Sequence, residues 1–71
     1  MNPECYTYFI RWSQEDRLFL GRVCEFDSLT AHGDTPARAL REIIFVVKNV
    51  VEDLKANNET IPEPMSEVNW S

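Results

Sequence analysis

One short motif, Gly33-Asp34-Thr35-Pro36, separates two kinds of sequence and constrains the order of elements in this chain. Gly33 permits a backbone turn that a side chain would obstruct. Thr35 can accept a hydrogen bond from a backbone N–H in the first turn of a helix. Pro36 suits the first helical position because it has no N–H to leave unpaired. The motif therefore predicts extended chain before residue 33 and a long helix from residue 36.

The segment after the motif predicts one helix over residues 36–56. The run from Ile43 to Val47 is locally strand-like, but the helix-start signal, the length and the apolar spacing of three and four favour a helix. Asn57 and Asn58 can adopt the left-handed conformation that closes a helix. The apolar residues form one broad stripe along it, which consists of Leu40, Ile43, Ile44, Val47, Val50, Val51 and Leu54.

Aromatic and β-branched residues before the motif predict strands separated by a polar turn at Ser13 to Asp16. The expected elements are strands at 5–12, 18–24 and 29–32, the helix at 36–56, and a closing strand or tail at 61–71. The order β-β-β-α-β predicts a two-layer α+β fold, an antiparallel sheet of three or four strands with one long helix packed on one face. The chain, 1–71, is expected to form a single domain.

Size and composition favour a small intracellular protein. At 71 residues the chain is near the lower limit for a self-sufficient core, so a homo-oligomer, dimer or higher, is expected to supplement it. No run approaches the roughly 18 apolar residues of a membrane span. The first residues lack the basic and apolar regions of a signal peptide, which predicts a cytoplasmic location. In that compartment Cys5 and Cys24 are more often thiols than a disulfide.

The sequence offers no recognisable catalytic set, and we expect no enzyme activity, cofactor or metal. His32 is the single histidine, and no Cys-x-x-Cys or histidine cluster completes a metal site. Acidic residues near element ends could share a divalent ion, although turns and helix starts attract Asp and Glu for structural reasons. A net charge of −5 argues against direct nucleic-acid binding, which needs a basic patch.

Large apolar residues are expected on both faces of the sheet and on the charged face of the helix. Strand alternation separates Phe9 from Tyr8, and Phe19 from Leu20, so each face of the sheet receives an aromatic side chain. Phe45 falls outside the apolar stripe of the helix, where it either lies exposed or anchors a partner within a polar rim. The candidate partner or self-association residues are Phe9, Phe19, Phe45, Glu42 and Glu52.

The segment that contains the second and third predicted strands and the helix start resembles the N-terminal domain of HicB-type antitoxins. The family pattern is aromatic-Val-Ala-x-Val-Pro-Glu-Leu-Pro-Gly, a short strand, and then Gly-Asp-Thr-x-x-x-Ala-Leu. The second part is followed closely by Gly33, Asp34, Thr35, Ala39 and Leu40. The first part is followed approximately by Phe19, Leu20, Gly21, Val23, Glu25 and Phe26, with Cys24, Asp27 and Ser28 in place of its prolines and glycine. The resemblance extends from Tyr6 to Pro64.

This resemblance implies a non-catalytic protein-binding module that neutralises a small basic HicA-type mRNA-cleaving toxin by covering its active histidine and RNA surface. The acidic net charge is compatible with steering toward such a partner. Many members of that family carry a C-terminal DNA-binding domain, which this chain is expected to lack. The alternative is an orphan homo-oligomeric accessory protein of the same fold with no toxin partner, whose second sheet face is buried against another copy.

Overall fold

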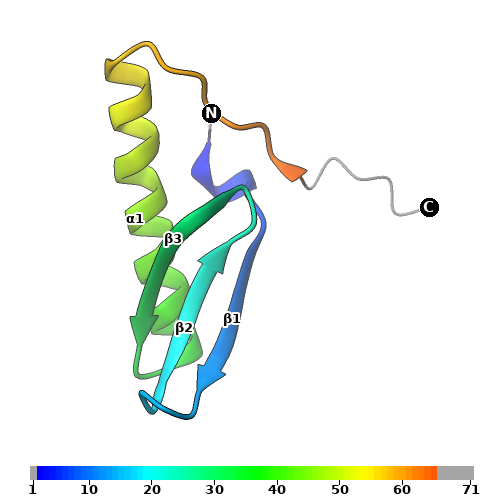
Figure 1. The fold of residues 1–71 in the computed structure, drawn as a ribbon, viewed down its shortest axis with the longest axis vertical. Coiled ribbons are helices and arrows are strands. Elements are labelled where there is room, and N and C mark those ends of the chain that lie inside the picture. Colours follow the sequence, from blue (N-terminus) through cyan, green and yellow to red (C-terminus); the bar gives the residue numbers. More distant parts are fainter. Residues whose placement is uncertain (1, 66–71) are drawn as a thin grey trace, which may run out of the picture.

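The computed structural model of this chain describes residues 2–65. Its elements are a short 3-10 helix, η1 (Pro3–Cys5), the strands β1 (Tyr8–Ser13), β2 (Leu18–Val23) and β3 (Phe26–Gly33), and the helix α1 (Pro36–Ala56). The strands form an antiparallel sheet in the order β1-β2-β3, and α1 packs on one face of it (Figure 1). The predicted α+β fold with β-β-β-α order is therefore confirmed.

Helix α1 begins and ends where the sequence signals place it. The Thr35 hydroxyl accepts a hydrogen bond from the Arg38 amide at 3.1 Å, and Pro36 is the first helical residue. At the other end Asn58 adopts a left-handed conformation with φ 56°. Gly33 has a different role from the one expected, because its φ is not positive. A Cβ there would lie 2.6 Å from the Ala39 amide nitrogen, so the missing side chain allows close packing of β3 on α1.

The strands differ from the prediction at their ends. β1 begins at Tyr8 rather than at residue 5, because Pro3 starts η1 and the Asn2 side chain caps it by accepting a bond from the Glu4 amide at 3.0 Å. β3 begins at residue 26 rather than 29, because β2 and β3 are joined by a two-residue turn at 24–25. Residues 61–65 form no strand, and the rest of the expected closing segment lies outside the described residues.

The core lies between α1 and the sheet. Ile43 and Val47 are fully buried, and Gly21 of β2 lets the helix approach closely, since a Cβ there would lie 2.7 Å from the Ala39 carbonyl oxygen. The buried apolar residues are Tyr6, Val23, Ala39, Ile43, Val47 and Val51. Their burial against water supplies the main stabilisation of the fold.

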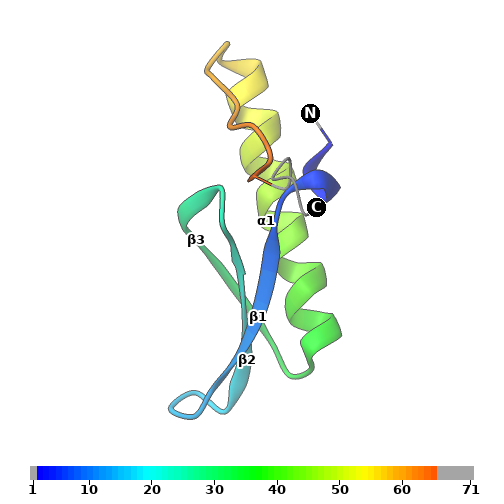
Figure 2. The same cartoon turned by 90° about the vertical axis from the view of Figure 1, so that its right-hand side faces the viewer.

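The layers do not match in width. Helix α1 contacts β3 more than β2 and β1 least, and Figure 1 shows β1 as the strand furthest from it. Figure 2 shows the sheet edge-on, with α1 on one side and no described element on the other. Among residues 2–65, one sheet face is therefore uncovered, and the helix-side face of β1 is only partly covered.

A carboxylate joins three segments that are distant in the sequence. Glu25, in the turn between β2 and β3, accepts hydrogen bonds from the Thr7 amide at 3.0 and 3.1 Å and from the Met65 amide at 2.7 Å. The Tyr6 hydroxyl donates to the Pro62 carbonyl oxygen at 2.7 Å. These bonds hold the segment after α1 against the start of β1.

The same region perturbs both tyrosines. Burial, followed by the negative charge of Glu25, raises the pKa of Tyr8 from 10.0 to about 12. Burial, and then Glu25 and Glu63, also raise the pKa of Tyr6. Both hydroxyls remain neutral donors at ordinary pH, and Tyr8 donates to the Pro3 carbonyl oxygen at 2.7 Å.

No helix within residues 2–65 is long and apolar enough to cross a membrane. Cys5 and Cys24 are not joined by a disulfide.

Candidate partner-binding surfaces

The candidate residues do not gather into one patch. Phe9 lies on the uncovered sheet face, whereas Phe19 lies on the helix side of the sheet, because the registers place Phe9 opposite Arg22 and Phe19 opposite Trp12. Phe45 lies on the outer face of α1 and is 61% exposed. The fold therefore presents three separate apolar surfaces rather than the single one that a list of aromatic residues suggests.

The outer face of α1 carries a stripe with an aromatic centre. Glu42, Phe45, Asn49 and Glu52 follow one another at intervals of three, four and three residues, so they lie on one side of the helix, and all four are exposed. We call these four residues the outer stripe. Cations flank it at Arg38, Arg41 and Lys48. The outer stripe offers a partner one large apolar side chain between two carboxylates.

The uncovered sheet face is mixed in character. Phe9 is 46% exposed there, and Leu18 and Leu20 of β2 are half-buried. Arg22, opposite Phe9, donates from its Nη2 to the Asp27 carbonyl oxygen at 2.9 Å. This face also carries Arg11, Thr30 and His32. Its charged side chains are basic, so it does not match a basic partner.

A third surface runs along the helix side of β1, and Phe19 is its one residue among the candidates that the sequence predicts. Trp12 is 47% exposed and packs edge-on against Phe19, with ring centroids 4.9 Å apart. Leu40 of α1 is 38% exposed, and Ile44 lies one turn further along. The apolar residues of this surface, which we call the β1 strip, are Ile10, Trp12, Phe19, Leu40 and Ile44.

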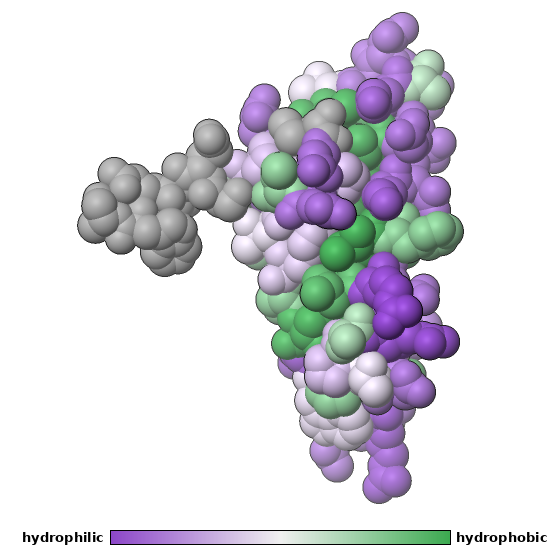
Figure 3. Space-filling view, turned by 180° about the vertical axis from the view of Figure 1, so that it is seen from behind, coloured by the Kyte–Doolittle hydropathy of each residue, from purple (hydrophilic) through white to green (hydrophobic). Residues whose placement is uncertain are grey.

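The exposure of the β1 strip follows from the position of α1. Arg38 and Glu42 line a hollow beside β3, and Leu40 and Ile44 point to the opposite flank of the helix, toward β1. Figure 3 shows apolar side chains in a band beside the helix on this face of the molecule. Strand alternation in β1 was the available signal, but it does not reveal that one helix leaves part of a three-stranded sheet uncovered.

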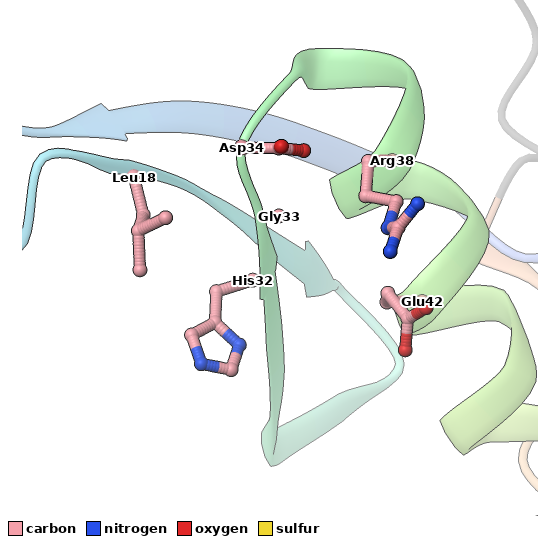
Figure 4. A pocket seen from close by; sticks show the side chains of 6 residues that line it. All are labelled: Leu18, His32, Gly33, Asp34, Arg38 and Glu42. Carbon is pink, nitrogen blue, oxygen red and sulfur yellow. The ribbon is translucent and has the colours of Figure 1, made fainter.

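The hollow beside β3 has a volume of about 360 Å³ and is open and polar (Figure 4). It is lined by Leu18, His32, Gly33, Asp34, Arg38 and Glu42. In Figure 4, Arg38 and Glu42 extend from the helix on one side of β3, while His32 and Leu18 lie on the other side. These side chains are spread around the strand and do not converge on one point. No group of three or more metal-ligating side chains occurs within residues 2–65.

Comparison with protein-family models, curated proteins and solved structures finds no match for this chain.

Proposed function

We propose that this chain is a non-catalytic protein-binding module of the cytoplasm, an antitoxin that neutralises a small basic HicA-type mRNA-cleaving toxin. The outer stripe is its contact surface. The observation that carries the proposal is Phe45, the most exposed large apolar side chain among residues 2–65, held between Glu42 and Glu52 on a rigid helix.

The dimensions and charges of the outer stripe suit this role. From Glu42 to Glu52 the helix rises about 15 Å, which is long enough for two separate charge contacts around a central aromatic. An aromatic anchor inside a polar rim is the usual arrangement of a binding hot spot. Glu42 and Glu52 are the two acceptors that the outer stripe offers to lysine and arginine side chains of the partner, whereas Arg38, Arg41 and Lys48 repel such side chains.

The net charge of −5 acts at longer range. It attracts a basic partner before contact and raises the association rate, and salt screens that attraction over about 10 Å at 0.1 M. The association rate of the complex should therefore fall as salt is added, while its contact surface stays the same.

The test is co-expression with the product of the neighbouring gene, followed by size-exclusion chromatography with light scattering. We expect a heteromeric peak from the wild-type chain and its loss in Phe45→Glu, because a carboxylate in place of the ring removes the anchor. Phe9→Glu is the matched control, since Phe9 is a similarly exposed phenylalanine on another face, and should keep the complex. No heteromeric peak with the wild type, or a complex unaffected by Phe45→Glu, would contradict the proposal.

The alternative function is an orphan accessory protein that associates only with itself. The uncovered sheet face and the exposed Phe9 favour it, because both offer surface that a second copy could cover. A stable homo-oligomer that ignores the neighbouring gene product in the same co-expression experiment would select this alternative.

A further inference from the structure

The outer edge of β1 has backbone groups with no partner strand among residues 2–65, where β1 pairs with β2 alone. The Thr7 carbonyl accepts a hydrogen bond from the Cys24 amide at 2.9 Å, so residue 7 points toward β2. Backbone direction alternates along an antiparallel strand. The N–H and C=O groups of Tyr8, Ile10 and Trp12 therefore point away from β2, toward the open side of the sheet.

This edge carries few of the devices that usually protect an edge strand. Such devices are charged side chains, above all lysine, proline, a bulge or a covering helix, and the one charged side chain of β1 is Arg11. β1 contains neither proline nor lysine, and its pairing with β2 continues without a register shift from residue 8 to residue 13. The opposite edge strand, β3, has the most extensive contact with α1. β1 is thus the edge at which another strand can add.

We propose that β1 pairs antiparallel with β1 of a second copy of this chain, around a two-fold axis at Ile10. In this register Ile10 faces Ile10 of the second copy, and Tyr8 faces Trp12. The outward-pointing backbone groups of Tyr8, Ile10 and Trp12 are then hydrogen-bonded in both strands. They form about six main-chain hydrogen bonds, two for each of three opposed pairs. The two sheets join into one continuous sheet.

The side chains on the uncovered face support the same register. Phe9 lies opposite Arg11 of the second copy, so the only charged side chain of β1 meets an aromatic ring. An axis at Arg11 would instead oppose two guanidinium groups, which is unfavourable. An axis at Phe9 would leave the outward-pointing groups of Trp12 unpaired. Of these registers, only the one centred on Ile10 satisfies both the backbone and the charge.

The β1 strip also gains contacts from this pairing. A two-fold axis perpendicular to the sheet places both helices on the same face, on either side of the joined β1 strands. The exposed ring of Trp12 then stands beside Tyr8 of the second copy, as an aromatic cross-strand pair. The dimer does not depend on a toxin, because Phe45 lies on the outer side of α1, away from β1.

The first test is the mass of the full chain by light scattering across a range of concentrations. We expect a species of twice the 8.3 kDa chain mass that dissociates on dilution. A monomer at the highest concentration would overturn the proposal.

The second test fixes the register by crosslinking. In a Cys5→Ser and Cys24→Ser background, we expect Phe9→Cys with Arg11→Cys to form a disulfide-linked dimer on a non-reducing gel. The two new cysteines cannot bridge within one strand. The Cα atoms of residues two apart in a strand are nearly 7 Å from one another, which is too far for an unstrained disulfide. Phe9→Cys alone is the matched control and should stay monomeric on the gel. Crosslinking by Phe9→Cys alone, or none by the pair, would overturn this register.

The third test uses charge without cysteine chemistry. Phe9→Glu places a carboxylate opposite Arg11 of the second copy and should keep the dimer. Adding Arg11→Glu opposes two carboxylates at two places and should raise the dimer dissociation constant at least about tenfold. Circular dichroism of the double variant checks that it is folded. Equal dissociation constants for the single and double variants would contradict the pairing of residues 9 and 11.

Discussion

Gly21 lies where β2 meets the first turns of α1, and the atom nearest to its missing Cβ is a backbone oxygen. The Ala39 carbonyl oxygen would be 2.7 Å from that Cβ, and Ile43 Cγ2 would be 3.0 Å away. We expect Gly21→Ala to lower the free energy of unfolding by about 1–3 kcal/mol, because the helix must shift away from the sheet. Urea denaturation measures this change. Ser28→Ala, at an exposed site in β3, should stay within about 0.5 kcal/mol, and an equal loss in both variants would contradict the packing role of Gly21.

Tyr8 links stability to pH at the alkaline end. Its pKa is raised from 10.0 to about 12, so the unfolded chain loses the phenolic proton first. The stabilisation from neutral Tyr8 is complete below pH 10 and is lost as the pH rises toward about 12. Tyrosinate absorbance should show the folded protein titrating above 10 and the urea-unfolded chain near 10. Tyr8→Phe should reduce the fall of stability between pH 10 and about 12. If the fall is unchanged in this variant, groups other than Tyr8 cause it.

At the scale of elements, the Glu25 carboxylate acts as the junction of β1, the β2–β3 turn and the segment after α1. Glu25→Ala removes the acceptor of the Thr7 and Met65 amides and should cost about 1–3 kcal/mol, whereas Glu25→Gln keeps one acceptor oxygen and should cost less. Hydrogen exchange of these two amides should quicken in Glu25→Ala. The neighbouring exposed residue gives the control Asp27→Ala, in which exchange should not change. Slow exchange of both amides in Glu25→Ala would show that the carboxylate does not hold them.

The elements also show what local sequence can predict. Helix α1 was predicted at its observed bounds, because its start and end depend on nearby residues such as Thr35 and Asn58. The predicted start of β3 is wrong by three residues, because the tight turn at 24–25 depends on pairing between strands rather than on local preference. The predicted start of β1 is wrong because Pro3 begins η1.

The candidate surfaces divide in the same way. The exposure of Phe45 follows from helical spacing alone, and the structure agrees with it. The separation of Phe9 from Phe19 onto opposite faces of the sheet follows from strand alternation. The β1 strip could not be predicted as one surface, because its exposure depends on which strands α1 covers. That is decided by close contacts at Gly21 and Gly33.

At the scale of the whole molecule, self-association would make stability depend on concentration. If β1 pairs with a second copy, the melting temperature should rise with protein concentration, because only the folded chain can form the dimer. In the Phe9→Glu, Arg11→Glu double variant the melting temperature should rise less over the same range of concentration, because its dimer is weaker. Differential scanning calorimetry over a hundredfold range of concentration makes the comparison. A wild-type melting temperature that is independent of concentration would argue against the dimer.

The hydrogen bond from Tyr6 to Pro62 joins residues 56 positions apart, and the bond from Met65 ends on a carboxylate that exists as a site only once the β2–β3 turn has formed. Contacts of such long range close large loops, which is slow compared with forming a hairpin or a helix. The docking of residues 61–65 should therefore be the last step of folding and the first to reverse. A protease that cuts at Glu59 or Glu63 would then act on molecules whose sheet and helix are still intact, and the rate of cutting would report this local opening rather than global unfolding.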